Sequence, residues 1–351
     1  MIDTKYYSVE KDKQLSSDFW TVQLYKSAYE LIDEKDRFPL VIPSYNRPDC
    51  LFLEWVHSSL QNSSETWPIY LMVRDSQVDM YKNASMIKDY DFIHVISRPD
   101  EEIDDVGKAR KAILSYFFDK TDWVFMLDDD VLEVGFSVPI ARKNSLASGI
   151  VKNTNYARVF AMWQRATQVA QKYRPDDLFE TAMYANSFAW MPECCDPSRS
   201  VFYGKGTTGV CTAINIKFAK DHGLNFMTIK GNGHDDANFV FRCLLNGGIA
   251  AIFSWLVFRY DNGLNDKSKH EVFSDEDMAA RFKRQQTELQ SIFHDCPFLK
   301  FTTAKSNKYD VVNIDWRKAV KYHNENFKNY PPLDYKKRLF DLSEEMIYGK
   351  T

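Results

Sequence analysis

The sequence predicts an α/β protein whose mixed, mainly parallel sheet carries helices on both faces and is followed by a C-terminal helical extension. Two observations lead to this class. Short, almost uninterrupted apolar runs recur through residues 38–127, and segments with the 3.6-residue period of helices alternate with them. Each intervening helix returns the chain to the same end of the sheet, so successive strands run parallel. With 44% hydrophobic residues, the 351-residue chain can bury a substantial core.

The expected elements follow in order along the chain. Apolar runs without polar alternation predict the first four strands, at residues 38–43, 69–73, 93–96 and 123–127. The helices expected between them cover residues 49–59, 79–88 and 104–118. Further apolar runs predict strands at residues 186–190, 210–216 and 250–255. A helix is expected from Asp235 to Leu245, because the Asn246-Gly247-Gly248 that follows is typical of a helix end.

Charge is distributed unevenly along the chain. The whole protein has 45 Lys and Arg against 49 Asp and Glu, whereas residues 281–351 have 14 against 9. In this segment basic residues such as Arg317 and Lys318 are interleaved with aromatic ones, which suits a phosphate backbone and stacked bases. A solvated helical face has the same composition. We expect an N-terminal helical extension over residues 1–35, a central domain over 36–280 and a basic, aromatic-rich extension over 281–351.

The sequence also bears on location. It contains no stretch of roughly 18 apolar residues, the length that a bilayer span needs. Its first residues, including Asp3, Lys5 and Glu10, are too charged for a signal peptide. The six cysteines lack metal-binding spacing and are expected to be free thiols. These features predict a cytoplasmic protein without a membrane partner.

Ligands of open parallel sheets bind outside the carboxyl ends of the strands, so the residues that follow each apolar run form the candidate site. Polar and charged residues follow all four predicted strands of the first half. They are Ser44, Tyr45 and Arg47 after the first, Asp75 after the second, Lys108 and Arg110 after the third, and Asp128, Asp129 and Asp130 after the fourth. We expect the chemistry of the protein to occur among them.

The acidic triplet is the most informative of these motifs. Three adjacent carboxylates at a strand end repel one another, and a divalent cation removes that conflict. Asp128 and Asp130 stand two apart on an extended segment, so both can address one ion while Asp129 faces elsewhere. The alternative is an acidic surface turn that binds no metal. The position directly after a buried strand favours metal binding.

Over roughly residues 36–260 the sequence resembles nucleotide-sugar glycosyltransferases of the GT-A fold, which is Rossmann-like. The likeness lies in the order of three motifs. They are the strand end Pro43-Ser44-Tyr45-Asn46-Arg47-Pro48, the helix start Gly107-Lys108-Ala109-Arg110, and Leu127-Asp128-Asp129-Asp130.

The resemblance implies a UDP-sugar donor and a bound Mn²⁺ or Mg²⁺, held chiefly by Asp130. It implies that Asp128 contacts the metal, the ribose or the sugar, beside Asp129 in the donor site. The turn with Ser44, Tyr45 and Arg47 would bind the nucleobase or the phosphates, together with Asp75, and Lys108 and Arg110 would lie on the diphosphate side. A late His is a metal ligand in some GT-A families, which makes His270 a further candidate.

A second acidic group opens the helix expected at residues 235–245. In inverting GT-A enzymes, which this region resembles, a Glu-Asp pair opens a helix, an Arg follows about six residues later, and the pair supplies the base that deprotonates the acceptor. Asp236 stands six residues before Arg242, so Asp236 is the first candidate base and Asp235 the second. His234 stands where the family has Glu. The alternative role of both aspartates is to cap the helix N-terminus.

The Ser-Tyr-Asn-Arg-Pro turn, the acidic triplet and the Gly-His-Asp-Asp helix start together resemble bacteriophage DNA-base glycosyltransferases, which are related to the enzyme that makes base J. This resemblance implies transfer of glucose, or of a pentose such as arabinose, to 5-hydroxymethylcytosine or 5-hydroxymethyluracil in phage DNA within the host cytoplasm. Such a base must be flipped out of its duplex. Two alternatives stay open: a polysaccharide or protein acceptor, and a catalytically silent binding module.

Overall fold

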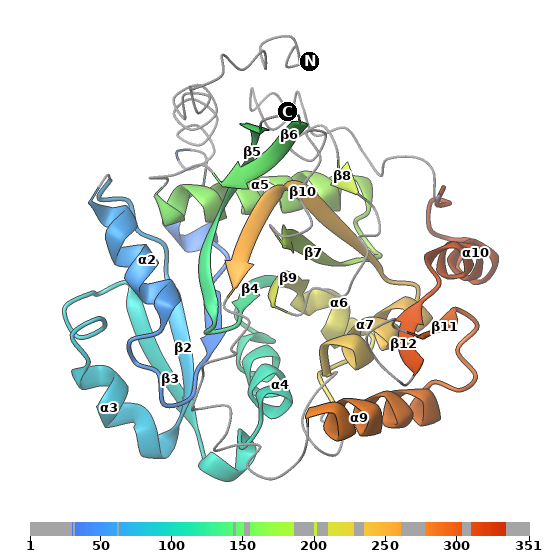
Figure 1. The fold of residues 1–351 in the computed structure, drawn as a ribbon, viewed down its shortest axis with the longest axis horizontal. Coiled ribbons are helices and arrows are strands. Elements are labelled where there is room, and N and C mark those ends of the chain that lie inside the picture. The colour runs from blue at the N-terminus through green and yellow to red at the C-terminus, as the bar shows by residue number, and fades with distance from the viewer. Residues whose placement is uncertain are drawn as a thin grey trace.

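The computed structural model describes residues 30, 32–61, 63–142, 145–150, 155–185, 200–201, 210–227, 235–260, 278–303 and 310–334. Its main sheet has the strand order β3-β2-β1-β4-β9-β7-β10-β5-β6, with β8 paired to β10, and a separate hairpin joins β11 to β12 (Figure 1). The strands of the main sheet are β1 (Leu40–Pro43), β2 (Ile69–Arg74), β3 (Ile93–Arg98), β4 (Trp123–Leu127), β5 (Val131–Arg142), β6 (Ser145–Ile150), β7 (Leu178–Ala185), β8 (Ser200–Val201), β9 (Cys211–Asn215) and β10 (Ile249–Tyr260). The hairpin strands are β11 (Leu299–Thr303) and β12 (Asp310–Ile314).

Helices of the described residues precede, separate or follow these strands along the chain. The α-helices are α2 (Leu51–Leu60), α3 (Val78–Asn83), α4 (Val106–Phe117), α5 (Tyr156–Tyr173), α6 (Ile216–Asp221), α7 (Asp235–Leu245), α9 (Met278–Ile292) and α10 (Trp316–Asn326). Short 3₁₀ turns are η2 (Glu34–Asp36), η3 (Asp75–Gln77) and η4 (Asp100–Glu102). None of the helices in the described part of the chain is long and apolar enough to cross a membrane.

The first half of the sheet confirms the sequence prediction. Strands β1 to β4 lie side by side and parallel, with Leu40 opposite both Ile69 of β2 and Phe125 of β4. All residues of β1 and β4 are buried, which explains why both strands are continuous apolar runs. Helices α2 and α4 occupy two of the predicted helical segments. The helix predicted at residues 79–88 is shorter, because α3 ends at Asn83 and the backbone of Ala84 is extended.

The second half of the sheet agrees with the sequence only in part. The predicted strands at residues 210–216 and 250–255 correspond to β9 and β10, and α7 has the predicted bounds. Strand β9 runs antiparallel between β4 and β7, a reversal that the apolar run did not reveal. Strand β7 and helix α5 were not predicted. The strand predicted at 186–190 and almost all of the N-terminal extension at 1–35 lie outside the described residues.

Helices cover both faces of the sheet, as the sequence predicts. The chain moves from β1 through β2 to β3 in one direction and then returns to β4 on the other side of β1. Right-handed crossovers therefore place α4 on the face opposite α2 and α3. Helix α5 shares the face of α2: the Phe160 ring of α5 lies 6.4 Å from Phe52 of α2 and 5.1 Å from Phe125 of β4.

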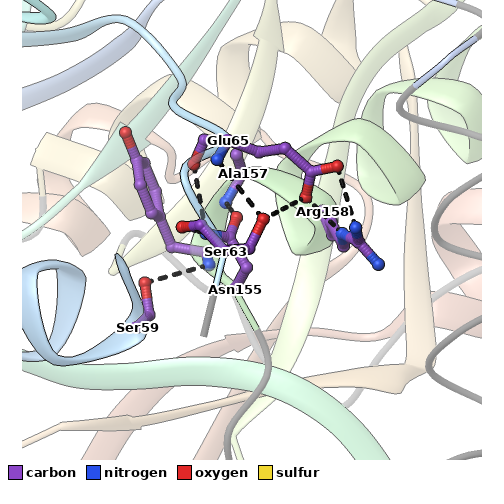
Figure 2. A network of polar contacts seen from close by, with 7 residues as sticks. Ser59, Ser63, Glu65, Asn155, Ala157 and Arg158 are labelled. Atoms are coloured by element: carbon purple, nitrogen blue, oxygen red, sulfur yellow. Dashed lines mark hydrogen bonds and ion pairs between the residues drawn. The ribbon is translucent and has the colours of Figure 1, made fainter. Parts of the chain in front are cut away.

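The N-terminus of α5 is bonded to the loop before β2 (Figure 2). Asn155 caps the helix by accepting a hydrogen bond from the Ala157 amide at 2.9 Å, and its Nδ2 donates to the carbonyls of Ser63 and Glu65, each at 3.1 Å. Arg158 forms a two-pronged ion pair with Glu65. This network joins the N-terminus of α5 to the loop that leads into β2.

The C-terminal extension packs on the main domain where the structure describes it. Tyr322 of α10 donates to the carbonyl of Leu245 at 3.4 Å, and Phe327 packs on Gly247, whose φ of +82° ends α7. A buried cluster of Arg174, Asp177 and His323 joins α10 to the turn before β7. The division into a central domain and a C-terminal extension stays a prediction.

Asn155→Ala is expected to lower the free energy of unfolding by about 1–3 kcal/mol, because it removes the α5 cap and two partly buried hydrogen bonds. Chemical unfolding followed by circular dichroism measures the change. Asn83→Ala, which removes an exposed 2.7 Å hydrogen bond to the Asp79 carbonyl, is the control and should change stability far less. Equal losses in the two variants would contradict the structural role of Asn155.

Candidate functional site

The turn after β1 is held in a strained backbone conformation by two buried residues around α3. Asn46 has a φ of +55°, which an L-residue rarely adopts. Gln77 Nε2 donates to Asn46 Oδ1 at 2.6 Å, and Gln77 Oε1 accepts a hydrogen bond from the Asn46 amide. The Tyr81 hydroxyl lies 2.7 Å from Ser44 Oγ and accepts a hydrogen bond from the Arg47 amide at 2.9 Å. Local sequence carried no signal for Gln77 and Tyr81, since both act across more than 25 residues.

This fixed turn brings Arg47 to the acidic triplet. Arg47 Nη1 lies 2.9 Å from Asp129 Oδ1, and Ser44 Oγ donates to Asp129 Oδ2 at 3.2 Å. Burial raises the pKa of Asp129, while the Arg47 charge opposes the shift. The predicted donor residues Ser44 and Arg47 are thus joined to Asp129.

The remaining predicted donor residues lie around the ends of β2 and β3. The Arg74 guanidinium lies 4.2 Å from the centre of the Tyr45 ring and donates to the carbonyl of Ile103 at 3.3 Å. Asp75 follows β2 and is exposed. Lys108, on the first turn of α4, forms a 2.6 Å ion pair with Asp104. Tyr45 and Asp75 follow the neighbouring parallel strands β1 and β2, and Lys108 lies on the helix that follows β3.

The carboxylates of the triplet differ in their surroundings. Asp128 Oδ1 lies 2.6 Å from Arg110 Nη2. Burial raises the Asp128 pKa, the Arg110 charge opposes the shift, and the negative charges of Asp130 and Asp129 add to it. Oδ1 of Asp130 is also buried. Within the triplet, Asp129 thus forms an ion pair with Arg47, and Asp128 forms one with Arg110.

The described residues fit a divalent cation only as a two-carboxylate site. They contain no group of three or more His, Cys, Asp or Glu side chains arranged to hold a metal. Asp128 and Asp130 offer hard oxygen donors at the end of β4, and Mg²⁺-type sites commonly combine one or two carboxylates with substrate phosphates. His270, the third predicted ligand, lies outside the described residues, as does His234.

The two candidate bases at the start of α7 have different environments. Asp235 is buried, and its Oδ2 lies 2.8 Å from Arg110 Nη1. Asp236 is half-buried and accepts a hydrogen bond from the Ala237 amide at 2.7 Å. Arg242, six residues later, donates to the Asn225 carbonyl at 2.8 Å. Arg110 thus brings the start of α7 next to the acidic triplet, although 125 residues separate Arg110 from Asp235.

Glu180 of β7 is a buried carboxyl beside this helix that the sequence analysis missed. Its pKa is raised to about 8, first by burial and then by the negative charge of Asp236. Burial, and next the proximity of Glu180, raises the pKa of the Cys243 thiol in α7. A single Glu inside the run Leu-Phe-Glu-Thr-Ala-Met-Tyr-Ala was the available signal. At neutral pH the buried Glu180 is protonated.

Comparison with known proteins assigns no family by sequence, since neither a family model nor a curated protein matches the chain. Among solved structures, the chain is similar to S. aureus TarS 1-349, with 11% identity, 74% of this chain and 72% of that chain covered, and a TM-score of 0.39. It is similar to GalNAc-T7 with UDP, GalNAc and Mn²⁺, with 12% identity, a TM-score of 0.38, and 67% of this chain but 49% of that chain covered.

A mycobacterial protein is also similar, with 11% identity, a TM-score of 0.42, and 84% of this chain and 87% of that chain covered. All three TM-scores are below 0.5, so these likenesses do not establish the activity of this chain.

Glu180→Gln should remove a pH dependence of stability. Because the folded-state pKa of about 8 exceeds the ordinary glutamate pKa of 4.5, the folded protein retains a proton that the unfolded chain releases. The contribution of Glu180 to the free energy of unfolding is fully present below pH 4.5. It is lost as the pH rises toward 8, by about 1.4 kcal/mol per pH unit inside this window. Urea unfolding at several pH values measures the slope. Exposed Glu101→Gln is the control, and an unaltered slope in Glu180→Gln would refute the assignment.

Proposed function

We propose that this protein is a metal-dependent glycosyltransferase of the GT-A type, which takes its sugar from a UDP-sugar. The observation that carries the proposal is the meeting of the acidic triplet with the Asp235-Asp236 start of α7, joined through Arg110. Sugar transfer from a nucleoside diphosphate needs a site for the charged diphosphate next to a base for the acceptor hydroxyl. This sheet edge offers both.

The donor would lie along the ends of β1, β2 and β4. The fixed Ser44–Arg47 turn supplies a cation and small donors, and the Tyr45 ring supplies an apolar face for a nucleobase. Lys108 adds positive charge at the first turn of α4, where helix amide groups also favour anions. Asp75 is exposed beside this turn and can accept a hydrogen bond from the base.

Asp130 and Asp128 would hold Mn²⁺ or Mg²⁺, with His270 as a further ligand. When bound, such a cation neutralises charge that develops on the departing diphosphate. Asp129 would act through Arg47, because their ion pair fixes the guanidinium at the triplet.

Asp236 is the favoured general base in an inverting displacement. Asp235 is occupied by the buried Arg110, whereas half-buried Asp236 stands on the first turn of α7, where a helix N-terminus stabilises a carboxylate. A base must reach the acceptor hydroxyl within hydrogen-bond distance. Burial raises the pKa of its neighbour Glu180 to about 8, so at pH 7 Glu180 adds little negative charge beside Asp236.

For the acceptor we propose the hydroxymethyl group of 5-hydroxymethylcytosine or 5-hydroxymethyluracil in DNA. The motif order of the sequence supports this choice, together with exposed cations on α10 that suit a phosphate backbone. These are Arg317, Lys318 and Lys321. Lys336, Lys337 and Arg338, which continue the basic segment, lie outside the described residues.

The test incubates the protein with hydroxymethylcytosine DNA, hydroxymethyluracil DNA or unmodified DNA, Mn²⁺ and a panel of UDP-sugars, followed by mass spectrometry of the nucleosides. A hexose or pentose mass added only to a hydroxymethylated base supports the full proposal. UDP release without DNA labelling, together with labelling of a polysaccharide or protein, would support the glycosyltransferase and reject the DNA acceptor. Absence of UDP binding and UDP release would reject both.

Asp130→Asn is expected to lower transfer by at least 100-fold, and excess EDTA should do the same to the unaltered protein, because no other described group offers the charge of a divalent cation. UDP release measures the loss, and added Mn²⁺ should restore activity only to the unaltered protein. Exposed Asp119→Asn is the control. Activity that survives EDTA would show that the reaction needs no metal.

Asp236→Asn is expected to lower kcat 10²–10⁴-fold while donor binding stays within about twofold, because a general base acts on the acceptor and not on UDP. Steady-state kinetics and calorimetry with UDP separate these effects. NMR of the product linkage is a second measurement, and an α-linkage from a UDP-α-sugar would contradict inversion. Near-normal kcat in Asp236→Asn would move the base to another residue.

A further inference from the structure

Arg110 is a buried cation between two functional segments. Its side chain is 6% exposed, with Nη2 2.6 Å from Asp128 Oδ1 and Nη1 2.8 Å from Asp235 Oδ2. Asp128 follows β4, and Asp235 begins α7. Both partners are themselves largely enclosed, with side chains 22% and 4% exposed. One guanidinium therefore joins the triplet to the helix that carries the candidate base.

The shape of the arginine side chain suits this position. A guanidinium is a rigid planar fork whose terminal nitrogens can donate to separate carboxylates, whereas lysine presents one compact ammonium. One guanidinium therefore donates to both carboxyl groups. A negative diphosphate that drew Arg110 away would leave Asp128 and Asp235 buried without this cation, which is energetically costly.

A second contact fixes α7 against the helix that carries Arg110. A Cβ placed on Gly107 of α4 would lie 3.0 Å from Asp235 Cβ and 3.3 Å from its Cγ. The backbone of α4 thus approaches Asp235 as closely as a residue without a side chain allows. Gly107 and Arg110 lie one turn apart on α4, so the start of α7 is positioned by a steric contact and by an ion pair from the same helix face.

We propose that Arg110 is a positioning residue that keeps both carboxylate partners while the donor is bound and so holds the Asp236-bearing turn of α7 in register with the acidic triplet. This inference rests on the proposed function. It assigns Arg110 a role other than the diphosphate ligand implied by the family resemblance. It also makes Asp235 a partner of Arg110 and leaves proton acceptance to Asp236.

The test compares Arg110→Lys, Asp235→Asn and their double variant in transfer kinetics, UDP calorimetry with Mn²⁺ and urea unfolding. A positioning role predicts that each single variant lowers kcat at least tenfold and that the double variant loses little more than the worse single one. The UDP Kd of Asp235→Asn should stay within twofold. Lys111→Gln, an exposed cation next to Arg110, is the matched control and should leave kcat and Kd unchanged.

Two outcomes would overturn the positioning role. If Arg110 binds the diphosphate, Arg110→Lys raises the UDP Kd tenfold or more whether or not Asp235 is present, and Asp235→Asn leaves kcat unchanged. If Asp235 is itself the base, Asp235→Asn removes the acidic limb of the kcat–pH profile, which a positioning role leaves in place.

Gly107→Ala supplies a variant that removes no charge. Alanine within a helix ordinarily stabilises it relative to glycine, so a lower urea midpoint and a lower kcat at unchanged UDP Kd would show that displacing Asp235 is enough to impair transfer. A higher midpoint with full kcat would count against the proposal. If the unaltered protein does not bind UDP, the proposed function is rejected. If it binds UDP but the shifts in urea midpoint of Arg110→Lys and Asp235→Asn add up in the double variant, only the coupling between Arg110 and Asp235 is rejected.

Discussion

The site depends on the compensation of carboxylates that the fold crowds together at one sheet edge. Asp128, Asp129 and Asp130 follow β4, and Asp235 is packed against α4. Burying like charges is costly unless cations accompany them. Arg110 and Arg47 meet this requirement: Arg110 contacts Asp128 and Asp235, and Arg47 contacts Asp129. The two arginines thus lie where the crowded carboxylates require positive charge.

The turn after β1 is held in place by residues that lie close to it in space but far from it in the sequence. Arg47 lies on a turn that contains a left-handed Asn46, a conformation that persists only when its surroundings stabilise it. The buried side chains of Gln77 and Tyr81 provide those surroundings through hydrogen bonds from the next crossover. The geometry at β1 is therefore set by residues around α3, and the parallel order of β1 and β2 brings the two together.

Buried Glu180 shows a different answer to the same electrostatic problem. The carboxylates of the triplet are accompanied by arginines. Glu180, in contrast, lies near Asp236, and its raised pKa of about 8 leaves it mostly neutral at pH 7. A neutral Glu180 adds little negative charge beside Asp236 at the start of α7.

The sequence by itself determined the parallel half of the sheet, α4, α7 and the acidic motifs, because buried strands and helix ends leave local periodic signals. Continuous apolar runs identified β1 to β4, and Asn246-Gly247 identified the end of α7. Only the tertiary structure decided that β9 runs antiparallel, that Glu180 is buried near Asp236, and that Arg110 joins Asp128 to Asp235. Strand direction and ion pairing depend on which distant segments meet, and residues 125 apart carry no local periodicity that relates them.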